Sequence, residues 1–477
     1  MSLMSDNKIL VVDLDNTLIK SDLLFETFWA AISQNWRVIF HLFVSIFFGK
    51  AHLKRKLANS SEIDVPNLPY NTSVLDIIEE YKADGAKIAL VSASDQKLVD
   101  QIAKHLGFFD EAFGSNGDIN LKGKAKANFL INRYGKKKFI YVADDLSDLS
   151  IWQYSAKIIT INASKLLLHR VNNLEIPIKH VCTEEQKLTA FIKFMRPHQW
   201  TKNLLVFLPM TAAHLFAVDI LLSVFSTFLS FCLVASSGYI LNDLIDLQHD
   251  RRHPRKKNRQ IASGSVPIKE ASVVSPILLI CGMLLSLTVN WHVFAILSLY
   301  FLTTLLYSLV LKRKVIIDIF TLAGLYTHRV LAGAATLTIA PSIWLIAFSL
   351  FFFLSLAALK RQAELIIPQN SFSKKLDGRD YNRDDLPIVV GLGLSSGFLS
   401  VLVLLLYTQS ALVKNLYGFP EALLLAAIAI AYWISRLFLI SQRGGMHDDP
   451  IVFAIKDITS YVCLILVFAS TILGVLI

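Results

Sequence analysis

Residues 242–264 read NDLIDLQHDRRHPRKKNRQIASG and follow a long apolar run. On a helix that turns 100° per residue, the four oxygen-bearing side chains at its start fall within an arc of roughly 100°. They are Asn242, Asp243, Asp246 and Asp250. Carboxylates crowded on one face repel each other unless a cation lies among them, and Mg²⁺ takes such oxygen ligands and bridges them to phosphates. The stretch therefore predicts a metal–diphosphate site. The alternative is a solvated acidic helix end followed by a basic, cytoplasmic loop.

The composition indicates that this stretch belongs to a membrane protein. The chain has 477 residues, 54% of them hydrophobic, with a mean hydropathy of +0.51. That is too apolar for a soluble globule. The first ~185 residues have the composition of a soluble domain and show no cleavable signal peptide, and the rest alternates apolar runs with charged loops.

Nine apolar runs of the second half qualify as candidate membrane spans. They cover about residues 203–218, 220–241, 271–289, 292–310, 315–337, 342–359, 388–408, 421–440 and 458–476. Basic residues concentrate in the gaps after the second, fourth, sixth and eighth runs, whereas the opposite gaps hold little beyond Lys414. The positive-inside rule places those gaps and the N-terminal domain in the cytoplasm of a bacterial inner or plasma membrane, with the C-terminus outside.

The formal charge of +10 arises from the basic residues concentrated in these loops of the second half. Because the basic residues lie in these loops, we interpret them as topology signals and phosphate-binding groups, and we expect no nucleic-acid binding. The cysteines have no metal-like spacing and are expected to be plain core residues. They are Cys182, Cys232, Cys281 and Cys463.

Three apolar segments of the N-terminal half end in acids or hydroxyls. Residues 8–18 read KILVVDLDNTL, residues 87–94 read KIALVSAS and residues 139–148 read FIYVADDLSD. Each segment is typical of a buried strand, and open α/β sheets bind ligands at the carboxyl ends of their strands. Between the second and third segments a helix is expected to open with cations, at Lys122, Lys124 and Lys126. The pattern predicts a site for Mg²⁺ and phosphate.

This combination resembles the haloacid dehalogenase superfamily of phosphohydrolases over about residues 6–165. The resemblance implies that Asp13 attacks phosphorus and that Asp15 acts as general acid and base. It also implies that Ser92 and Lys124 hold the phosphoryl oxygens, with the two neighbouring lysines left open as alternatives. The implied Mg²⁺ ligands are Asp13, Asp15, Asp144 and Asp148. The competing interpretation is a degenerate Rossmann-like domain kept for docking.

Two further segments of the first half have weaker patterns. Residues 23–57 include the run WRVIFHLFVSIFF, which is too short to span a bilayer comfortably. We expect a helical cap there, either packed on the sheet or shielding a lipid-linked substrate. Residues 166–189 carry little pattern and are expected to form a linker.

The second half, residues 190–477, resembles the UbiA-type prenyltransferases. The nine spans and the NDxxDxxxD acids at the cytoplasmic end of the second span carry this resemblance. The strings RPHQWTKN (196–203) and MHDDPIVFAIKD (446–457), together with the 242–264 stretch, are similar to the branch that transfers phosphoribose onto polyprenyl phosphate. Gln260 stands where that branch would have proline.

One departure from the aromatic-acceptor members is informative. Those members carry a second acidic motif after the sixth span, where this chain has Lys360, Arg361 and Glu364 on one helix face. One acidic and one basic cluster suit an anionic acceptor together with a diphosphate leaving group. Arg329 lies roughly 15 Å into the fifth span, where a charge indicates function unless it forms a structural ion pair. Five residues near the last cytoplasmic gap could be either phosphate or metal contacts or plain surface residues: Arg436, Asp448, Asp449, Lys456 and Asp457.

The sequence thus predicts a multi-domain membrane enzyme. An α/β Rossmann-like haloacid dehalogenase domain with a helical cap is expected over residues 1–165. After a linker at 166–189, an all-α domain of nine transmembrane helices follows over residues 190–477. The expected reaction is Mg²⁺-dependent transfer of 5-phosphoribose from phosphoribosyl pyrophosphate to polyprenyl (decaprenyl) phosphate, and the fused phosphatase would remove the 5-phosphate.

The residues expected to bind substrate in the second half are mostly cations. They are Lys193, Arg196, Lys202, Asn203, Arg259, Arg329, Lys360, Arg361 and Glu364. Two alternative functions stay open: an aromatic or quinone-precursor prenyltransferase, and a lipid-phosphate binding or transport module with an inert phosphatase domain. The sequence also leaves open the prenyl length, the downstream glycan and the oligomeric state, for which a homo-oligomer is allowed.

Overall fold

The computed structural model describes residues 9–38, 55–57, 59–116, 120–182, 187–366, 379–410, 413, 416–446 and 449–476. The chain divides into two compact units. Unit 1 comprises Met1–Met195 and Ile240–Val274, and unit 2 comprises Arg196–Tyr239 and Ser275–Ile477. The acidic and basic stretch at residues 242–264 therefore belongs to the same unit as the N-terminal domain.

Unit 1 is built on a six-stranded parallel sheet with the order β3-β2-β1-β4-β5-β6. The strands are β1 Ile9–Val12, β2 Lys87–Asp95, β3 Glu111–Ser115, β4 Phe139–Ala143, β5 Lys157–Ile161 and β6 Ile178–Val181. Central strands of a parallel sheet are buried on both faces, which explains their continuous apolar runs. Because β1 lies between β2 and β4, its carboxyl end faces the crevice where such sheets bind ligands.

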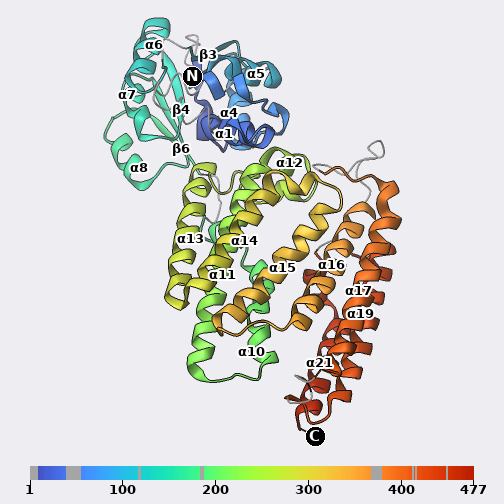
Figure 1. The fold of residues 1–477 in the computed structure, drawn as a ribbon. Helices are drawn as coiled ribbons and strands as arrows, with labels where there is room; N and C mark the ends of the chain where they lie inside the picture. The colour runs from blue at the N-terminus through green and yellow to red at the C-terminus, as the bar shows by residue number, and fades with distance from the viewer. Residues whose placement is uncertain are drawn as a thin grey trace. The chain divides into compact units, whose positions relative to one another are not determined.

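Helices cover both faces of this sheet (Figure 1). Leu10 and Val12 of β1 point to the face packed by α4 and α5, whereas Val11 points to the face packed by α6, α7 and α8. The helices of this unit are α1 Leu23–Gln34, α4 Thr72–Ala83, α5 Gln96–Leu106, α6 Lys124–Tyr134, α7 Leu149–Trp152, α8 Lys165–Asn172, α9 Lys187–Phe194 and α12 Leu247–Arg252. The alternating side chains of one strand thus contribute to two separate cores.

The structure corrects the expected linker. Residues 165–181 form α8 and β6, and Ile178 pairs in parallel with Ile158 of β5. The sheet therefore extends past residue 165, and residues 166–181 belong to the N-terminal domain. Of the expected cap, α1 is a helix, whereas residues 39–54 and 58 lie outside the described residues.

Unit 2 is helical. Long helices account for eight of the expected spans: α11 Val218–Ile245, α13 Ile268–Val289, α14 Trp291–Leu309, α15 Ile317–Thr336, α16 Ile343–Ile366, α17 Leu386–Thr408, α19 Leu423–Gln442 and α21 Ile458–Leu476. Within the described part of the chain, seven helices are long and apolar enough to cross a membrane, and α15 is not among them. Nine transmembrane helices are therefore not confirmed.

The first expected span, residues 203–218, is not a regular membrane helix. A 3₁₀ segment covers Pro197–Phe207, and the α-helix that follows, α10 Leu208–Ala212, has five residues. A five-residue helix rises only about 8 Å, far short of a bilayer core of about 30 Å. Hydropathy alone did not distinguish this packed segment from a span.

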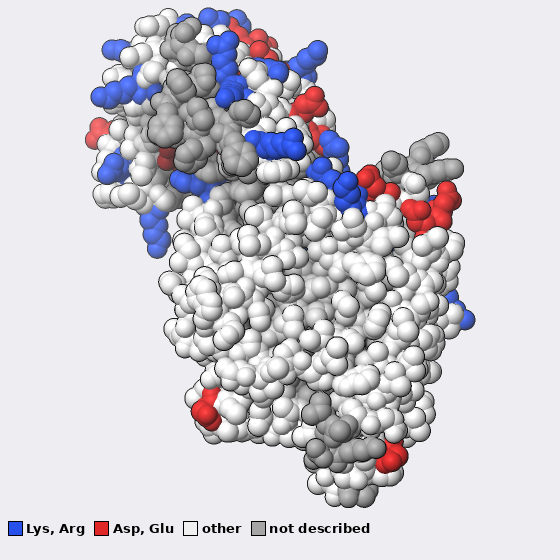
Figure 2. Space-filling view, viewed as in Figure 1, with Lys and Arg blue, Asp and Glu red and all other residues white. Residues whose placement is uncertain are grey.

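The surface of unit 2 is mostly uncharged on the face drawn in Figure 2. Large apolar side chains such as Leu222, Phe398 and Ile428 are exposed on its helices. Inside, Gly393 and Gly397 of α17 lie so close to Phe438 and Ile434 of α19 that an added Cβ would collide with them. Apolar exteriors combined with small residues at helix contacts are typical of membrane domains.

Candidate active sites

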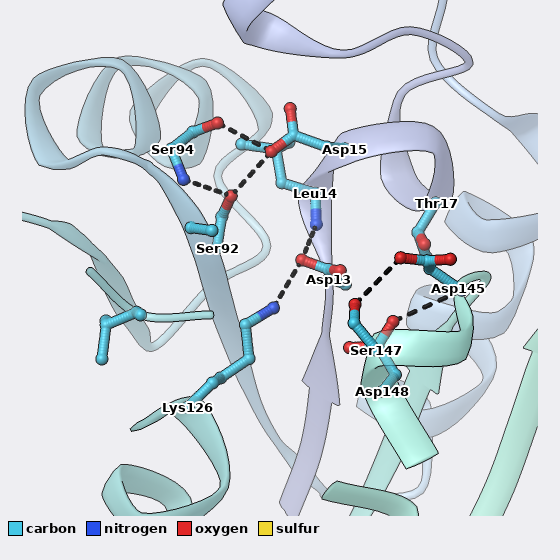
Figure 3. A network of polar contacts seen from close by, with 12 residues as sticks. Asp13, Leu14, Asp15, Thr17, Ser92, Ser94, Lys126, Asp145, Ser147 and Asp148 are labelled. Atoms are coloured by element: carbon cyan, nitrogen blue, oxygen red, sulfur yellow. Dashed lines mark hydrogen bonds and ion pairs between the residues drawn. The ribbon is translucent and has the colours of Figure 1, made fainter. Parts of the chain in front are cut away.

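The first site lies where β1 ends. Asp13 follows Val12, and its Oδ1 accepts hydrogen bonds from the backbone amide of Leu14 and from Lys126 Nζ, both at 2.8 Å (Figure 3). Asn16 has a φ of 56°, which turns the chain sharply after the strand. The turn leaves the carboxylate of Asp13 at the crevice beside β4.

Lys126 is the lysine of this site. It lies in the first turn of α6, is 3% exposed, and also donates to Tyr141 Oη at 3.0 Å. Burial lowers the pKa of Lys126, but Asp13 and Asp148 outweigh that effect and hold the pKa above its usual value. Lys124, which was expected in this role, is exposed to solvent. Lys126 is one of the two alternatives that the sequence left open, and it differs from Lys124 because two residues on a helix turn the side chain by about 200°.

Three carboxylates meet beside Lys126. One oxygen each from Asp13, Asp144 and Asp148 lies within 4.8 Å of the other two. Thr17 donates to Asp144 at 2.9 Å, and Tyr141 donates to Asp148 at 3.0 Å. All three donors are oxygens, so the set fits a hard divalent cation such as Mg²⁺.

Burial raises the pKa of all three carboxyl groups. For Asp148 burial, followed by the charge of Asp13, raises the pKa to about 7, although Lys126 opposes the shift. The pKa of Asp144 is raised well above its usual value by burial and then by Asp13. Burial also raises the pKa of Asp13, and Lys126 opposes that shift. Ionising all three carboxyl groups therefore costs free energy unless a cation lies among them.

Asp15 lies outside this carboxylate group. Its Oδ2 accepts from Ser94 Oγ at 2.7 Å and from Ser92 Oγ at 3.1 Å (Figure 3). Its Oδ1 accepts from the amide of Leu23 at 2.8 Å. The structure thus does not group the Asp15 carboxylate with the other expected Mg²⁺ ligands. Ser92, expected to hold phosphoryl oxygens, is buried and orients Asp15 in this structure.

The second site is the acidic stretch after α11. The helix ends at Ile245 and α12 begins at Leu247, so Asp246 marks a break in what was expected to be one helix face. Asn242 donates to Asp246 at 3.2 Å. Asp243 and Asp250 are buried. The α-helical backbone bonds nevertheless continue through the position of Asp246, from the Asp246 amide to the Asn242 carbonyl at 2.9 Å and from the Asp250 amide to the Asp246 carbonyl at 2.8 Å.

Arg259 joins the buried acids. Its Nη1 lies 3.0 Å from Asp243 Oδ1 and also bonds Asp250. Burial and then the charge of Asp243 raise the pKa of Asp250 to about 6, with Arg259 acting in the opposite direction. In the described part of the chain, this acidic stretch does not bring three carboxylate ligand atoms within 4.8 Å. The donor type and charge fit a divalent cation, and Arg259 supplies the positive charge in this structure.

Three other basic residues of unit 1 have other partners or are exposed to solvent. Arg251 forms an ion pair with Glu26, and Arg252 forms one with Asp64. Lys193, a candidate for anion binding, is exposed on α9. Arg259, in contrast, pairs with both Asp243 and Asp250.

Unit 2 contains a basic cluster of its own. Lys202, which is buried, and Lys360, on α16, both donate to Asp449 Oδ2, at 2.5 and 3.3 Å. Burial favours the neutral acid, but Lys360 and Lys202 together hold the pKa of Asp449 well below its usual range. Asp449 caps α20 (Pro450–Lys456) by accepting from the amide of Ile451. Asp449 was an open candidate, and its companion Asp448 lies outside the described residues.

Arg361 and Glu364 belong to a structural network instead. Arg361 is fully buried, lies 2.5 Å from Asp318 Oδ2 and bonds Glu364 on its own helix. Arg379 bonds Asp318 at 3.2 Å, and Tyr381 donates to the same carboxylate. In this structure the charge of Arg361 is neutralised inside the helix bundle, so its role in holding a substrate phosphate stays a prediction.

Arg329 is likewise buried within unit 2. It donates to Asn203 Oδ1 at 2.8 Å and to Tyr300 Oη at 3.2 Å, and its guanidinium lies over the rings of Phe231, Tyr300 and Tyr326. These contacts link α15 to the 3₁₀ segment that contains Asn203. The remaining candidates make separate contacts: Arg196 lies over the ring of Tyr239, and Arg436 pairs with Asp457 at 2.7 Å.

Comparison with known proteins identifies the family. Residues 204–454, more than half of the chain, match the UbiA prenyltransferase family. The chain belongs to the UbiA prenyltransferase family. With its long apolar helices, this UbiA-family chain is an integral membrane protein.

Relatives cover different parts of this UbiA-family chain. The uncharacterized protein y4nM of Sinorhizobium fredii is 34% identical over 457 residues, which are 95% of this chain and 88% of that protein. The decaprenyl-phosphate phosphoribosyltransferase of Mycolicibacterium smegmatis is 33% identical over 281 residues, 57% of this chain and 87% of that protein. The first relative therefore shares both halves, and the second matches little more than half of this chain.

A solved structure resembles the N-terminal domain. A substrate-bound phosphoserine phosphatase is 18% identical, covers 40% of this chain and 99% of its own, and has a TM-score of 0.27. Such a likeness is too distant to assign an activity. The proposal of a phosphatase activity for this domain, given below, rests instead on its parallel sheet and on the side chains at the end of β1.

Proposed function

We propose that the chain is a bifunctional membrane enzyme. The UbiA-family part would transfer 5-phosphoribose from phosphoribosyl pyrophosphate to a polyprenyl phosphate, with release of pyrophosphate. The N-terminal domain would then remove the 5-phosphate. The observation that carries the transfer is the pairing of Arg259 with the buried acids Asp243 and Asp250, in the part of the chain that is similar to a decaprenyl-phosphate phosphoribosyltransferase.

The transfer needs little acid–base chemistry. An oxygen of the polyprenyl phosphate would attack the anomeric carbon of ribose while the bond from that carbon to pyrophosphate breaks. A phosphate is already a competent nucleophile, so no strong base is required. Asp243 and Asp250, with Asn242 and Asp246 beside them, would hold Mg²⁺, which neutralises charge on the departing pyrophosphate when bound.

Lys202 and Lys360 are suited to an anionic group of the substrates. Both ammonium groups share the single carboxylate of Asp449, so two cations face one anion. A phosphate with two negative charges would balance them better than Asp449 does. Lys360 also occupies the place of the second acidic motif of aromatic-acceptor enzymes, which disfavours aromatic prenylation.

The phosphatase half would use the residues at the end of β1. Asp13 would attack phosphorus and form an aspartyl phosphate, and the bond to the ribose 5-oxygen would break. Asp15, oriented by Ser92 and Ser94, would protonate that leaving oxygen and then accept a proton from the water that hydrolyses the intermediate. Lys126 stabilises charge on the transferring group, and Asp13, Asp144 and Asp148 would hold Mg²⁺.

The positive-inside pattern supports a cytoplasmic N-terminal domain and an outward C-terminus. With this topology, the phosphatase would lie on the same side of the membrane as the phosphorylated product. Covalent tethering raises the local concentration of one site near the product of the other, in the millimolar range for short flexible links.

The transfer is tested by incubating the purified protein with phosphoribosyl pyrophosphate labelled in the ribose, polyprenyl phosphate and Mg²⁺. We expect label in the lipid phase, and we expect Asp250→Asn to lose it while still hydrolysing a soluble aryl phosphate. If no ribose label enters the lipid phase, whereas a separately labelled prenyl diphosphate is transferred to an aromatic acceptor, the proposed reaction is wrong.

A further inference from the structure

Helix α1 of the N-terminal sheet domain contacts the segment that carries the UbiA acids, within unit 1. The carboxylate of Glu26 on α1 accepts two hydrogen bonds from Arg251, at 2.6 and 3.0 Å. Both side chains are buried, and Arg251 directly follows Asp250. Ser21 donates to Glu26 at 2.6 Å, and Arg251 Nε donates to the carbonyl of Ala262 at 3.0 Å. A two-point ion pair thus joins the two parts of the sequence.

Other contacts surround this ion pair. Trp29 Nε1 donates to Ser272 Oγ at 2.9 Å. Gly264 has a φ of +78°, and a Cβ there would lie 2.7 Å from the Cβ of Lys20, so the two backbones approach closely. At the edge, Gln248 donates to the carbonyl of Glu62 at 3.0 Å. The contact is therefore continuous from α12 to the start of α13.

The part of the segment after α12 has little regular structure of its own. Helix α12 has six residues and continues α11 through backbone bonds from Asp246 to Asn242 and from Asp250 to Asp246, at 2.9 and 2.8 Å. The residues that follow, 253–264, form turns and a short 3₁₀ helix rather than a longer element. The position of Arg259 relative to Asp250 must therefore come from tertiary contacts, of which the buried Arg251–Glu26 pair is the most specific.

We propose that Glu26 is a positioning residue for the transferase site, supplied by the phosphatase domain. By holding the guanidinium of Arg251 at two points, Glu26 fixes the segment 247–264 and hence the geometry of Asp250 and Arg259. This inference rests on the proposed function in assigning Asp250 to the transfer reaction. It makes the N-terminal domain part of the transferase site rather than a separate enzyme on the same chain.

The same helix also reaches the phosphatase site. The amide of Leu23, the first residue of α1, donates to Asp15 at 2.8 Å, and Glu26 follows within the first turn. One helix is therefore held by a phosphatase residue at its start and by Arg251 a few residues later. An N-terminal domain supplied as a separate chain would have to rebuild this buried contact before transfer could proceed.

The test compares Glu26→Gln with the wild type in the full-length protein in lipid nanodiscs. Hydrogen exchange of peptides from residues 247–264 is measured by mass spectrometry. Removing the charge of Glu26 leaves Arg251 buried without its anion, so we expect exchange there to become about tenfold faster. We also expect the Mg²⁺ concentration for half-maximal transfer to rise by about the same factor.

The matched control is Glu111→Gln, which removes a carboxylate bonded at two points by Arg133 elsewhere in the same domain. Its exchange over residues 247–264 should equal that of the wild type. If Glu26→Gln fails to fold, Arg251→Lys keeps the charge but loses the two-point contact and should give an intermediate increase. Unchanged exchange in the folded variant would overturn the inference.

Exchange does not depend on turnover, so the two proposals fail separately. Wild-type protein that makes no labelled lipid contradicts the proposed function. Unchanged exchange in Glu26→Gln, with normal transfer by the wild type, contradicts only the positioning role.

Discussion

Lys126 Nζ lies 2.8 Å from Asp13 Oδ1, and both residues are almost completely buried. Tyr141 donates its hydroxyl to Asp148 and accepts from the same lysine, which ties the cation to the carboxylate group. A fixed cation at this distance stabilises negative charge that develops on a phosphoryl group attacked by Asp13.

Replacing Lys126 should therefore abolish most phosphatase activity. We expect Lys126→Met to lower the turnover of a soluble phosphate monoester by about 100-fold or more, because a pre-oriented charge at the transferring group is lost. The measurement is steady-state hydrolysis by the full-length protein. Lys124→Met, two residues earlier and exposed, is the control and should retain its rate. Equal losses in the two variants would contradict the assignment.

Mg²⁺ should stabilise the N-terminal domain more at high pH than at low pH. The folded domain binds protons at Asp144 and Asp148 more tightly than the unfolded chain does, since burial raises both pKa values. Metal-free protein therefore loses stability as the pH rises from about 4 to about 7. A cation that binds the ionised carboxylates removes this loss.

Calorimetry of the full-length protein checks that expectation. Mg²⁺ should raise the unfolding midpoint of this domain more at about pH 8 than at about pH 5.5, where protons compete for the same carboxylates. In the Asp148→Asn variant, the rise of the unfolding midpoint on adding Mg²⁺ should differ less between the two pH values. An equal effect of Mg²⁺ at both pH values would argue against metal binding by this group.

The adjacent residues Lys360 and Arg361 should respond differently to substitution. Lys360→Met should raise the KM for an anionic substrate about tenfold while leaving the protein folded, because Lys360 is partly exposed and shares its partner with Lys202. Arg361→Met should instead destabilise the helix bundle by about 3–5 kcal/mol, because it leaves Asp318 buried with fewer cations. Substrate kinetics and thermal unfolding of both variants separate the two roles. A rise in KM with unchanged stability for Arg361→Met would show that it binds substrate after all.

Local patterns were sufficient for much of the fold. The strands β1, β2 and β4 contain continuous apolar runs followed by polar residues, so they could be predicted as strands from sequence. The long membrane helices were predictable for the same reason. The short strand β6 was missed because IKHV has four residues and two of them are exposed.

The details of the sites depended on tertiary structure. Three lysines at alternate positions could each have met Asp13, and only the register of α6 selects Lys126. Arg361 has the sequence context of an anion-binding residue, but its partners Asp318 and Arg379 come from distant segments. Periodicity placed four oxygen donors on one helix face, but it could not show that Arg259, from the loop that follows, pairs with Asp243 and Asp250.

The lipid product of an Asp13→Asn variant tests the central claim, that one chain makes a phosphoribosylated lipid and then removes its phosphate. Wild type and variant are incubated with ribose-labelled phosphoribosyl pyrophosphate, polyprenyl phosphate and Mg²⁺, and the labelled lipids are separated by charge and analysed by mass spectrometry. The variant lacks the nucleophile but keeps the acidic segment of the transferase, so it should accumulate lipid-linked ribose 5-phosphate, whereas the wild type should yield lipid-linked ribose. The same lipid from both proteins would contradict the claim.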